Sequence, residues 1–479
     1  MNLATTTAEN PQATTAARPA DGKPPGPRRR WWGLPLLREM KADYLGFTDG
    51  LHREHGDITF MHIGPERAYD LFTPELVREA LVDHADAMIR WQRGIEIFEQ
   101  VFGQSVLVTE GATWQRQRRM LQPAFSPKRV AGYAALMRDA ALDALDQAVP
   151  AGQAQGLVEM DALWTKVAMD VIMRTLFTSR ASRDARDAAD ATQVLSEAAI
   201  REMFWPMTLP DWLPLPGKAK KRRALKALRG LVGRHIAARR TESADTPRDD
   251  LLAHLLALRD EGTNAALSDQ EVFDQCMVSF QAGHETSATA LLWWSRLMAE
   301  HPEAARRAQQ EVDAVLGSRE PGAEDLPALP WLTATLKEAM RLYPPIAAVM
   351  TRRTTRDITL GGWTIQSGAM LRITPWVLQR DPRSFSEPAR FLPERFLPDA
   401  PPPPRGAWMP FGSGPRVCIG QHFAMLEMTL VAALLLQRYT LALPPGASPV
   451  EPVMNVTLRP RGGVRLLLTR RPGFRSGHE

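Results

Sequence analysis

Residues 410–436 read PFGSGPRVCIGQHFAMLEMTLVAALLL and join a glycine-rich loop to a long apolar segment. The glycines and prolines predict an irregular loop, and the apolar run predicts a buried helix that begins near Gln421. Cys418 therefore lies just before the first turn of that helix. The unpaired backbone N–H groups and partial positive charge at a helix start are expected to lower the pKa of the thiol. A thiolate in this position favours metal ligation.

Three glycines in this loop, Gly412, Gly414 and Gly420, allow the backbone to fold closely around a flat ligand and to turn N–H groups toward the sulfur. A lone cysteine is ordinarily an inert core residue, and we interpret Cys276 in that way. A dinucleotide-binding loop is excluded, because the third glycine and the surrounding strand–helix–strand unit are missing.

The pattern F-x-x-G-x-R-x-C-x-G in this loop resembles the haem loop of the cytochrome P450 monooxygenases. Further family motifs occur in the expected order: Trp114 and Arg118 in W-x-x-x-R, AGHETS at 282–287, Glu338 and Arg341 in E-x-x-R, and PERF at 393–396. The resemblance covers roughly residues 24–470. It implies a mainly α fold with small β portions (α+β), the cytochrome P450 fold, in which a single haem domain at 24–479 follows a flexible tail at 1–23.

Composition is compatible with this interpretation. The chain has 479 residues, of which 44% are hydrophobic and 24% charged, so a disordered chain or a small disulfide scaffold is excluded. Length alone suggests about three domains, which the resemblance overrules. The net charge of +5 is dispersed, without interleaved aromatics, and predicts no nucleic-acid binding. No apolar run of about 18 residues predicts a membrane span. Two cysteines and no signal peptide indicate the cytoplasm.

Hydrophobic periodicity predicts helices over most of residues 130–343, including one at 249–262. Residues 57–63 alternate as a short strand, and residues 358–365 predict a hairpin that turns at Gly361 and Gly362.

The resemblance implies that the chain binds haem b, iron protoporphyrin IX, with Cys418 as the axial thiolate ligand of the iron. Phe411 would pack on the thiolate side, where Gly412 and Gly420 also lie. The haem propionates would be bound by Trp114 and by arginine forks suited to carboxylates, Arg118, Arg352 and Arg416. Arg353 is the weaker candidate of its pair.

The segment that contains AGHETS predicts a long buried helix with polar residues at its middle. One interpretation is structural, with Thr286 bonded back to a carbonyl one turn earlier. The resemblance implies instead that Ala282 and Gly283 open the helix beside the oxygen site, that Thr286 donates a hydrogen bond there, and that Glu285 supplies protons through water.

Glu338 and Arg341 lie three residues apart on a helix that ends before Pro344, so they can form an ion pair. The resemblance implies that Arg395 joins them and that the group holds this helix to the loop leading toward the haem. We predict a structural role, since removing one partner of a buried pair costs about 3 to 5 kcal/mol.

The activity implied is a monooxygenase that inserts one atom of O2 into an apolar small molecule, by hydroxylation or epoxidation of a fatty acid, terpenoid or polyketide. The expected substrate pocket is apolar and consists of Ile89, Trp91, Ile97, Phe98, Phe204, Ala282, Ile346, Val349 and Val456. Arg90 or Arg93 could bind a substrate carboxylate at its mouth. Alternatives are a peroxide-driven peroxygenase and a non-catalytic haem-binding protein.

No flavin, nicotinamide or iron–sulfur segment follows the haem loop, so electrons are expected from a separate ferredoxin or flavodoxin with its NAD(P)H reductase. We expect this carrier to dock near Arg116 and Arg119, which would face solvent. We expect a monomer.

Overall fold

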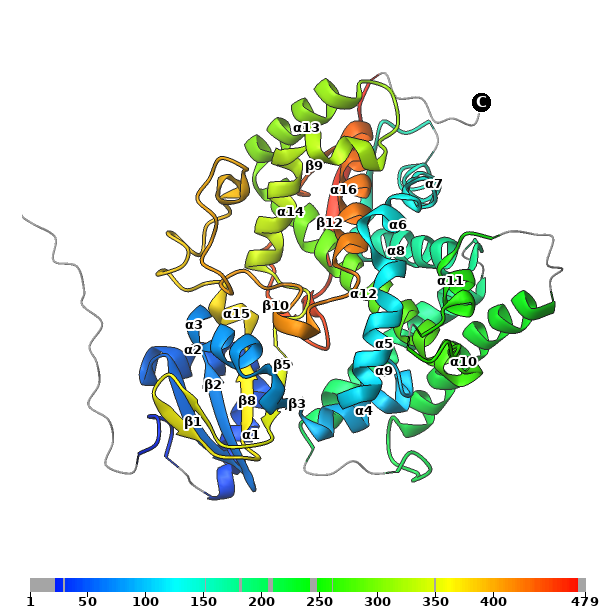
Figure 1. Ribbon diagram of the computed structural model, residues 1–479. Coiled ribbons are helices and arrows are strands. Elements are labelled where there is room, and N and C mark those ends of the chain that lie inside the picture. The colour runs from blue at the N-terminus through cyan, green and yellow to red at the C-terminus, as the bar shows by residue number, and fades with distance from the viewer. Residues whose placement is uncertain are drawn as a thin grey trace, which may run out of the picture.

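Helices make up most of the chain, as the sequence predicts, and a twisted sheet lies at one side of them (Figure 1). The computed structural model describes residues 22–28, 31–150, 152–180, 183–205, 210–241, 248–260, 262–348 and 350–472. Most of the predicted tail and Val349 lie outside the described residues. Lys23, which the sequence assigns to the tail, lies over the Phe60 ring at 5.0 Å from its centroid.

The larger sheet has five strands in the order β1-β2-β8-β5-β3. The strands are β1 (Ile58–Ile63), β2 (Glu66–Leu71), β8 (Met370–Ile373), β5 (Met350–Thr354) and β3 (Met88–Arg90). Only the β2–β8 pair is parallel. Helices α1 (Leu34–Ala42) and α2 (Tyr44–His55) pack beside β1 at the lower left of Figure 1. The sheet therefore joins the start of the chain to residues more than 300 positions later.

The predicted hairpin is confirmed. Strands β6 (Ile358–Leu360) and β7 (Trp363–Ile365) pair antiparallel, with Leu360 opposite Trp363. Gly361 and Gly362 form the turn with φ of 55° and 77°, a conformation that favours glycine.

The helical part is built around α12 (Asp269–Glu300), which runs through the middle of the molecule. A capping box starts this helix: Ser268 Oγ accepts from Glu271 N, and Glu271 accepts from Ser268 N. Against it pack α8 (Met160–Phe177), α13 (Pro302–Leu316), α14 (Pro330–Leu342) and α16 (Gln421–Arg438), and α7 (Ala134–Leu145) packs on α8 and α16. Helix α16 begins at the residue that the sequence predicts.

A second helical layer covers the lower right of Figure 1. It consists of α4 (Gln92–Phe102), α5 (Gly111–Leu121), α9 (Arg183–Met203), α10 (Lys218–Thr241) and α11 (Leu251–Ala257). The helix predicted at 249–262 is shorter than expected: Asp250 caps its start by accepting from Ala253 N, and Leu258 is extended.

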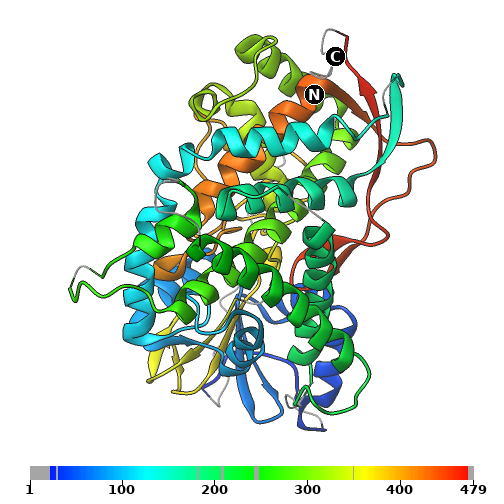
Figure 2. The same ribbon diagram turned by 90° about the vertical axis from the view of Figure 1, so that its right-hand side faces the viewer.

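The remaining elements complete the chain. A three-stranded sheet, β4 (Gln155–Glu159), β12 (Arg465–Arg470) and β9 (Tyr439–Ala442), lies along the upper edge in Figure 2, and β10 (Pro452–Met454) pairs with β11 (Leu458–Pro460). Short helices are α3 (Pro74–Arg78), α6 (Pro127–Ala131) and α15 (Pro375–Leu378), and helical turns occupy Trp31–Gly33, Glu79–Asp83, Ala85–Ala87, Gln122–Phe125, Ala323–Ala328, Pro393–Phe396 and Gly414–Arg416. No helix among the described residues is long and apolar enough to cross a membrane.

Candidate active site

The loop before α16 is held in a fixed shape by its own backbone. Cys418 N donates to Phe411 O at 2.9 Å, and Val417 N donates to Gly414 O at 3.1 Å. Gly414 has φ 73°, and a Cβ atom there would lie 2.2 Å from Leu81 O, so only glycine fits. The loop therefore presents Cys418 directly at the start of α16.

The Cys418 side chain is exposed by surface area, yet protein atoms surround its thiol. Burial raises the pKa of this thiol, while the Gly420 backbone N–H and the charge of Arg118 lower it. The expected lowered pKa is wrong in net direction for the free thiol, because desolvation outweighs the N–H groups and the cation.

Helix α12 is exposed at Ala282, within a buried part of its length. Gln281, His284 and Glu285 are buried, whereas Ala282 is exposed within the same turn. At Gly283, in the same turn, a Cβ atom would lie 2.8 Å from Ile172 Cδ1 of α8, so this glycine permits the close packing of α12 on α8. That Ala282 and Gly283 open the helix beside the oxygen site stays a prediction.

Glu285 is buried and held by side chains from other elements. Ser196 Oγ of α9 donates to Glu285 Oε2 at 2.8 Å, and Thr457 Oγ1 donates to Oε1 at 2.9 Å. The Arg459 guanidinium lies 3.9 Å from Oε1. Thr286 Oγ1 donates to Ala282 O at 2.8 Å, which is the bond to a carbonyl one turn earlier. This bond leaves the Thr286 oxygen able to accept a further hydrogen bond.

Several arginines gather near the Cys418 loop with few anions between them. Arg416 donates to Thr109 O at 3.1 Å and to Glu110 Oε2, and its guanidinium lies 4.2 Å from the centroid of the Trp114 ring. Burial lowers the pKa of Arg416 to about 10, and repulsion from Arg352 and Arg118 adds to this, while Glu110 raises it.

Arg90 belongs to the same cluster, although the sequence assigned it to a substrate carboxylate at the pocket mouth. Burial lowers its pKa to about 9, helped by repulsion from Arg416 and Arg352. Its Nη1 atom is buried and has no hydrogen-bond partner among the described residues. We define the arginine cluster as Arg90, Arg118, Arg352 and Arg416. Its cations outnumber its carboxylate, Glu110, so the cluster suits an additional anionic group.

Four other arginines considered in the sequence analysis bind partners outside the arginine cluster. Arg353 pairs with Glu66 at 2.7 Å, and Arg93 donates to Glu202 O at 2.6 Å. Arg116 pairs with Glu271, and Arg119 pairs with Asp260 at 3.2 Å. The expectation that Arg116 faces solvent is wrong, because this ion pair keeps its side chain partly buried; Arg119 is mostly exposed.

The predicted ion pair of α14 is present and fully buried. Arg341 Nε donates to Glu338 Oε2 at 2.7 Å, and Arg395 Nε lies 3.4 Å from Glu338 Oε1. Sequence reasoning missed Gln379, whose Nε2 donates to Arg341 O and whose Oε1 accepts from Met409 N, at 2.9 and 2.8 Å. Gln379 thereby connects α14 to the segment just before the Cys418 loop.

These features can be compared with known proteins. A family model described as Cytochrome P450 matches residues 24–467. The chain belongs to the cytochrome P450 family.

Three named relatives show how far the similarity of this cytochrome P450 extends. "Cyclooctat-9-en-7-ol 5-monooxygenase" of Streptomyces melanosporofaciens is 35% identical over 442 residues, covering 90% of this chain and 94% of the relative. "Pentalenene oxygenase" of Streptomyces avermitilis is 33% identical over 470 residues, covering 96% and 99%. The plant protein "LUTEIN DEFICIENT 5, chloroplastic" of Arabidopsis thaliana is 31% identical over 443 residues, covering 87% and 72%. The chain is thus an oxidoreductase of the monooxygenase type.

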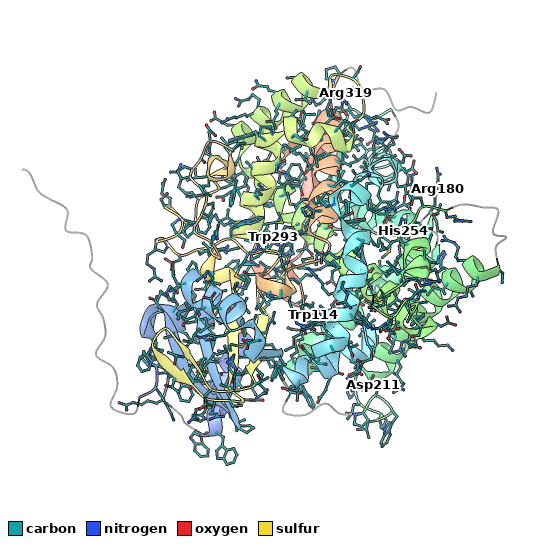
Figure 3. All side chains as sticks on the ribbon, viewed as in Figure 1. Trp114, Arg180, Asp211, His254, Trp293 and Arg319 are labelled. Atoms are coloured by element: carbon teal, nitrogen blue, oxygen red, sulfur yellow. The ribbon has the colours of Figure 1, made fainter. Side chains whose placement is uncertain are left out.

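Membership of the P450 family implies a haem-iron cofactor. The residues fit such a group, because the thiol of Cys418 and Ala282 of the otherwise buried α12 are both exposed, and the arginine cluster has more cations than its one carboxylate, Glu110, can neutralise. Figure 3 shows Trp114 of α5 near the middle of the molecule, beside this region.

The residues predicted to line the substrate pocket of this P450 lie in several environments. Ile97 is only 1% exposed, and Phe98 stacks on Phe102 with ring centroids 5.9 Å apart. Phe204 contacts Tyr44 edge-on, whereas Trp91 packs against the core beside the sheet. Ile89 lies on β3, and Ile346 and Val456 are half-buried in loops.

Proposed function

We propose that this cytochrome P450 hydroxylates or epoxidises an apolar terpenoid with O2, using haem b bound between Cys418 and α12. The observation that carries the proposal is the Cys418 thiol, which a glycine-rich loop places, exposed, at the start of α16; the exposed Ala282 of α12 and the arginine cluster, with its unpartnered Arg90 Nη1, support it. The printed names of the Streptomyces relatives support the substrate class.

The chain supplies ligands for each part of the cofactor. The Cys418 thiolate would ligate the haem iron, and Phe411 and the glycines of the same loop would pack beside this ligand. Trp114 and the arginine cluster, which includes Arg90, would bind the propionates as charge-assisted pairs. When bound, the haem iron supplies the activation of O2, and a thiolate ligand favours cleavage of the O–O bond.

Glu285 and Thr286 of α12 would control the delivery of protons. Glu285 accepts hydrogen bonds from Ser196 and Thr457 at rest, so its carboxylate must be released from at least one of them before it can pass a proton. Thr286 Oγ1 donates a hydrogen bond to Ala282 O. The lone pairs of the Thr286 oxygen therefore remain able to accept a hydrogen bond from a neighbouring donor. We propose Glu285 as the proton source and Thr286 as the group that positions it.

Electrons would come from a separate ferredoxin or flavodoxin with its NAD(P)H reductase. Helix α6 packs against α16, which begins beside Cys418, and carries the exposed cations Lys128 and Arg129, of which Arg129 pairs with Asp249 at 2.9 Å. An acidic carrier would find cations there. We propose that the enzyme works as a monomer in the cytoplasm, and that residues 24–479 form its one haem domain.

Optical titration of the purified haem protein tests the substrate class. We would add a cyclic diterpene alcohol, a cyclic sesquiterpene and a long-chain fatty acid separately, and follow the spin state of the iron. A shift with the terpenoids, followed by oxygenated product when a surrogate ferredoxin and reductase are added, supports the proposal. A spin-state shift and product with the fatty acid alone would show that the substrate is a fatty acid and not a terpenoid. NADPH-driven turnover without any added carrier would refute the proposal of a separate redox partner.

A further inference from the structure

Large apolar side chains are exposed in two segments of the chain. Among the described residues, six of the eight exposed large hydrophobic side chains belong to the start of α1 and to the end of α9 and the loop after it. They are Trp31 (82% exposed), Trp32 (68%), Leu34 (63%), Trp205 (46%), Trp212 (73%) and Leu215 (36%). We call these six residues the tryptophan face. The two other exposed large hydrophobic side chains among the described residues are those of Val82 and Leu157.

The two segments lie at the same end of the molecule. In Figures 1 and 2, views related by a 90° turn, the start of α1 and the connection between α9 and α10 both lie at the lower edge. Figure 3 labels Asp211 of this connection at that edge. Tyr44 of α2 and Phe204, next to Trp205, are in contact with ring centroids 6.2 Å apart. The tryptophan face is thus one side of the fold built from two segments.

The N-terminal tryptophans are held in place by the sheet. Gly64 N donates to Trp32 O at 2.8 Å, and Phe60 N donates to Pro25 O at 3.0 Å. Trp31 and Trp32 have φ of 46° and 58°, a left-handed conformation that is unfavourable for bulky residues. A costly backbone that turns two indoles outward points to a use for them at the surface.

The second segment is fixed by a cluster of charges around two buried lysines, Lys218 and Lys221. Lys218 Nζ lies 2.7 Å from both Glu202 Oε1 and Asp211 Oδ1, and Lys221 Nζ lies 3.0 Å from Glu202 Oε2. Lys221 also donates to Gln100 of α4 at 2.6 Å. The two buried lysines therefore join the loop that carries Trp212 to the end of α9, and they neutralise Asp211 of the loop and Glu202 of α9.

The exposed charges that remain around this loop are positive. Between Arg201 and Lys226, the exposed charged residues that the structure describes are Arg201, Lys220, Arg222, Arg223 and Lys226. Beside the N-terminal tryptophans, Arg28, Arg38 and Lys41 are exposed together with Glu39 and Asp43. Indoles flanked by cations match the chemistry of an anionic lipid surface, where tryptophan sits at the headgroup level and cations pair with phosphates.

We propose that the tryptophan face docks this protein peripherally on an anionic lipid bilayer. Neither class of contact suffices alone, since stable attachment to a membrane surface takes both apolar insertion and electrostatic attraction. This inference does not depend on the proposed substrate.

Vesicle sedimentation of the purified holoprotein tests the proposal. The vesicles are phosphatidylcholine alone or an equal mixture with phosphatidylglycerol. We expect binding to the anionic vesicles at least about tenfold tighter than to the neutral ones, and weaker binding in high salt. The double variants Trp31→Ser/Trp32→Ser and Trp212→Ser/Leu215→Ser should each weaken binding by about tenfold or more. Leu157→Ser, on β4 at the opposite end in Figure 2, is the matched control and should bind like the parent.

Each variant must keep the haem spectrum and melting temperature of the parent, so that loss of binding reports the face and not the fold. Quenching of tryptophan fluorescence by brominated lipid in the parent would add support. Absence of binding to anionic vesicles, or binding that the tryptophan variants leave unchanged, overturns the proposal. So does a dimer in solution that these variants convert to monomer, because the face would then cover a second copy of the chain.

Discussion

Arg341, which is fully buried, and the partly buried arginine cluster differ in how completely the protein supplies hydrogen-bond partners for their guanidinium groups. Every N–H of Arg341 is used: Nε and Nη2 donate to Glu338, Nη1 donates to Gln379 O and Pro388 O, and Nη2 also donates to Arg390 O, all within 3.0 Å. In the arginine cluster, by contrast, Arg90 Nη1 has no partner among the described residues, and burial and mutual repulsion lower the pKa of Arg90 and of Arg416.

The difference separates a structural charge from one that awaits a ligand. A buried cation with a full set of acceptors stabilises the fold by its own contacts, whereas a group of cations with too few anions is costly until an anion arrives. Variants of single residues can therefore test whether a charged side chain with a full set of partners stabilises the fold, and whether one without them binds a ligand.

The largest effect is expected at the complete group. Arg341→Ala leaves the Glu338 carboxylate buried without its main partner and should destabilise folding by about 3 to 5 kcal/mol, measured by denaturant unfolding of the holoprotein. Arg390→Ala removes an exposed pair with Glu387 and serves as the control, with an expected change below about 0.5 kcal/mol. Equal destabilisation by both variants would break the comparison.

Glu285 is an exception to this distinction. It is buried and has hydrogen-bond partners, as Glu338 does, yet we propose that it transfers protons. Glu285→Gln keeps a similar shape and removes the acid, so kcat for the terpenoid should fall by about 100-fold. Terpenoid binding and the melting temperature should change little. A large drop in melting temperature with unchanged kcat per folded molecule would make Glu285 a structural residue like Glu338.

Arg90 tests the incomplete group. Arg90→Gln removes one proposed propionate contact and should weaken haem affinity by about tenfold, measured by transfer of haem to an apo-globin acceptor. The apoprotein should unfold at the same or higher denaturant concentration, because a buried unpaired cation is lost. Arg353→Gln, whose arginine pairs with Glu66, is the matched control for haem affinity. Loss of apoprotein stability in Arg90→Gln would contradict the assignment.

Glu427 of α16 is a buried acid with incomplete hydrogen bonding, and its effect should be visible in the pH dependence of stability. Ser287 Oγ donates to its Oε2 at 2.6 Å, Oε1 has no partner among the described residues, and burial raises its pKa to about 8. A carboxyl with a raised folded pKa binds its proton more tightly when folded, so stability should fall as pH rises from about 5 to 8. The slope from this group is at most about 1.4 kcal/mol per pH unit. Glu427→Gln should remove that part of the slope; an unchanged slope would rule Glu427 out.

Local signals predict the elements well. Glycine punctuation and apolar spacing give the start of α16 at Gln421, the β6–β7 turn at Gly361 and Gly362, and the Glu338–Arg341 pair, because each depends on residues close in sequence.

The features that sequence misses are brought together by distant segments. Gln379 bridges α14 and the Cys418 loop across long stretches of chain, and Lys218 and Lys221 are buried because Glu202 and Asp211 fold against them. Arg90 joins the arginine cluster only through the pairing of β3 with β5, which carries Arg352. For Cys418, the local helix start was visible but the enclosing protein that raises its pKa was not.

The central claim is that Cys418 is the axial ligand of a haem held between its loop and α12. The most direct test is the carbon monoxide difference spectrum of the reduced protein, recorded for the parent, for Cys418→Ser and for Cys276→Ser. We predict a thiolate-ligated haem spectrum in the parent and in Cys276→Ser, and its loss in Cys418→Ser. A thiolate spectrum that survives in Cys418→Ser, or is lost in Cys276→Ser, would contradict the account.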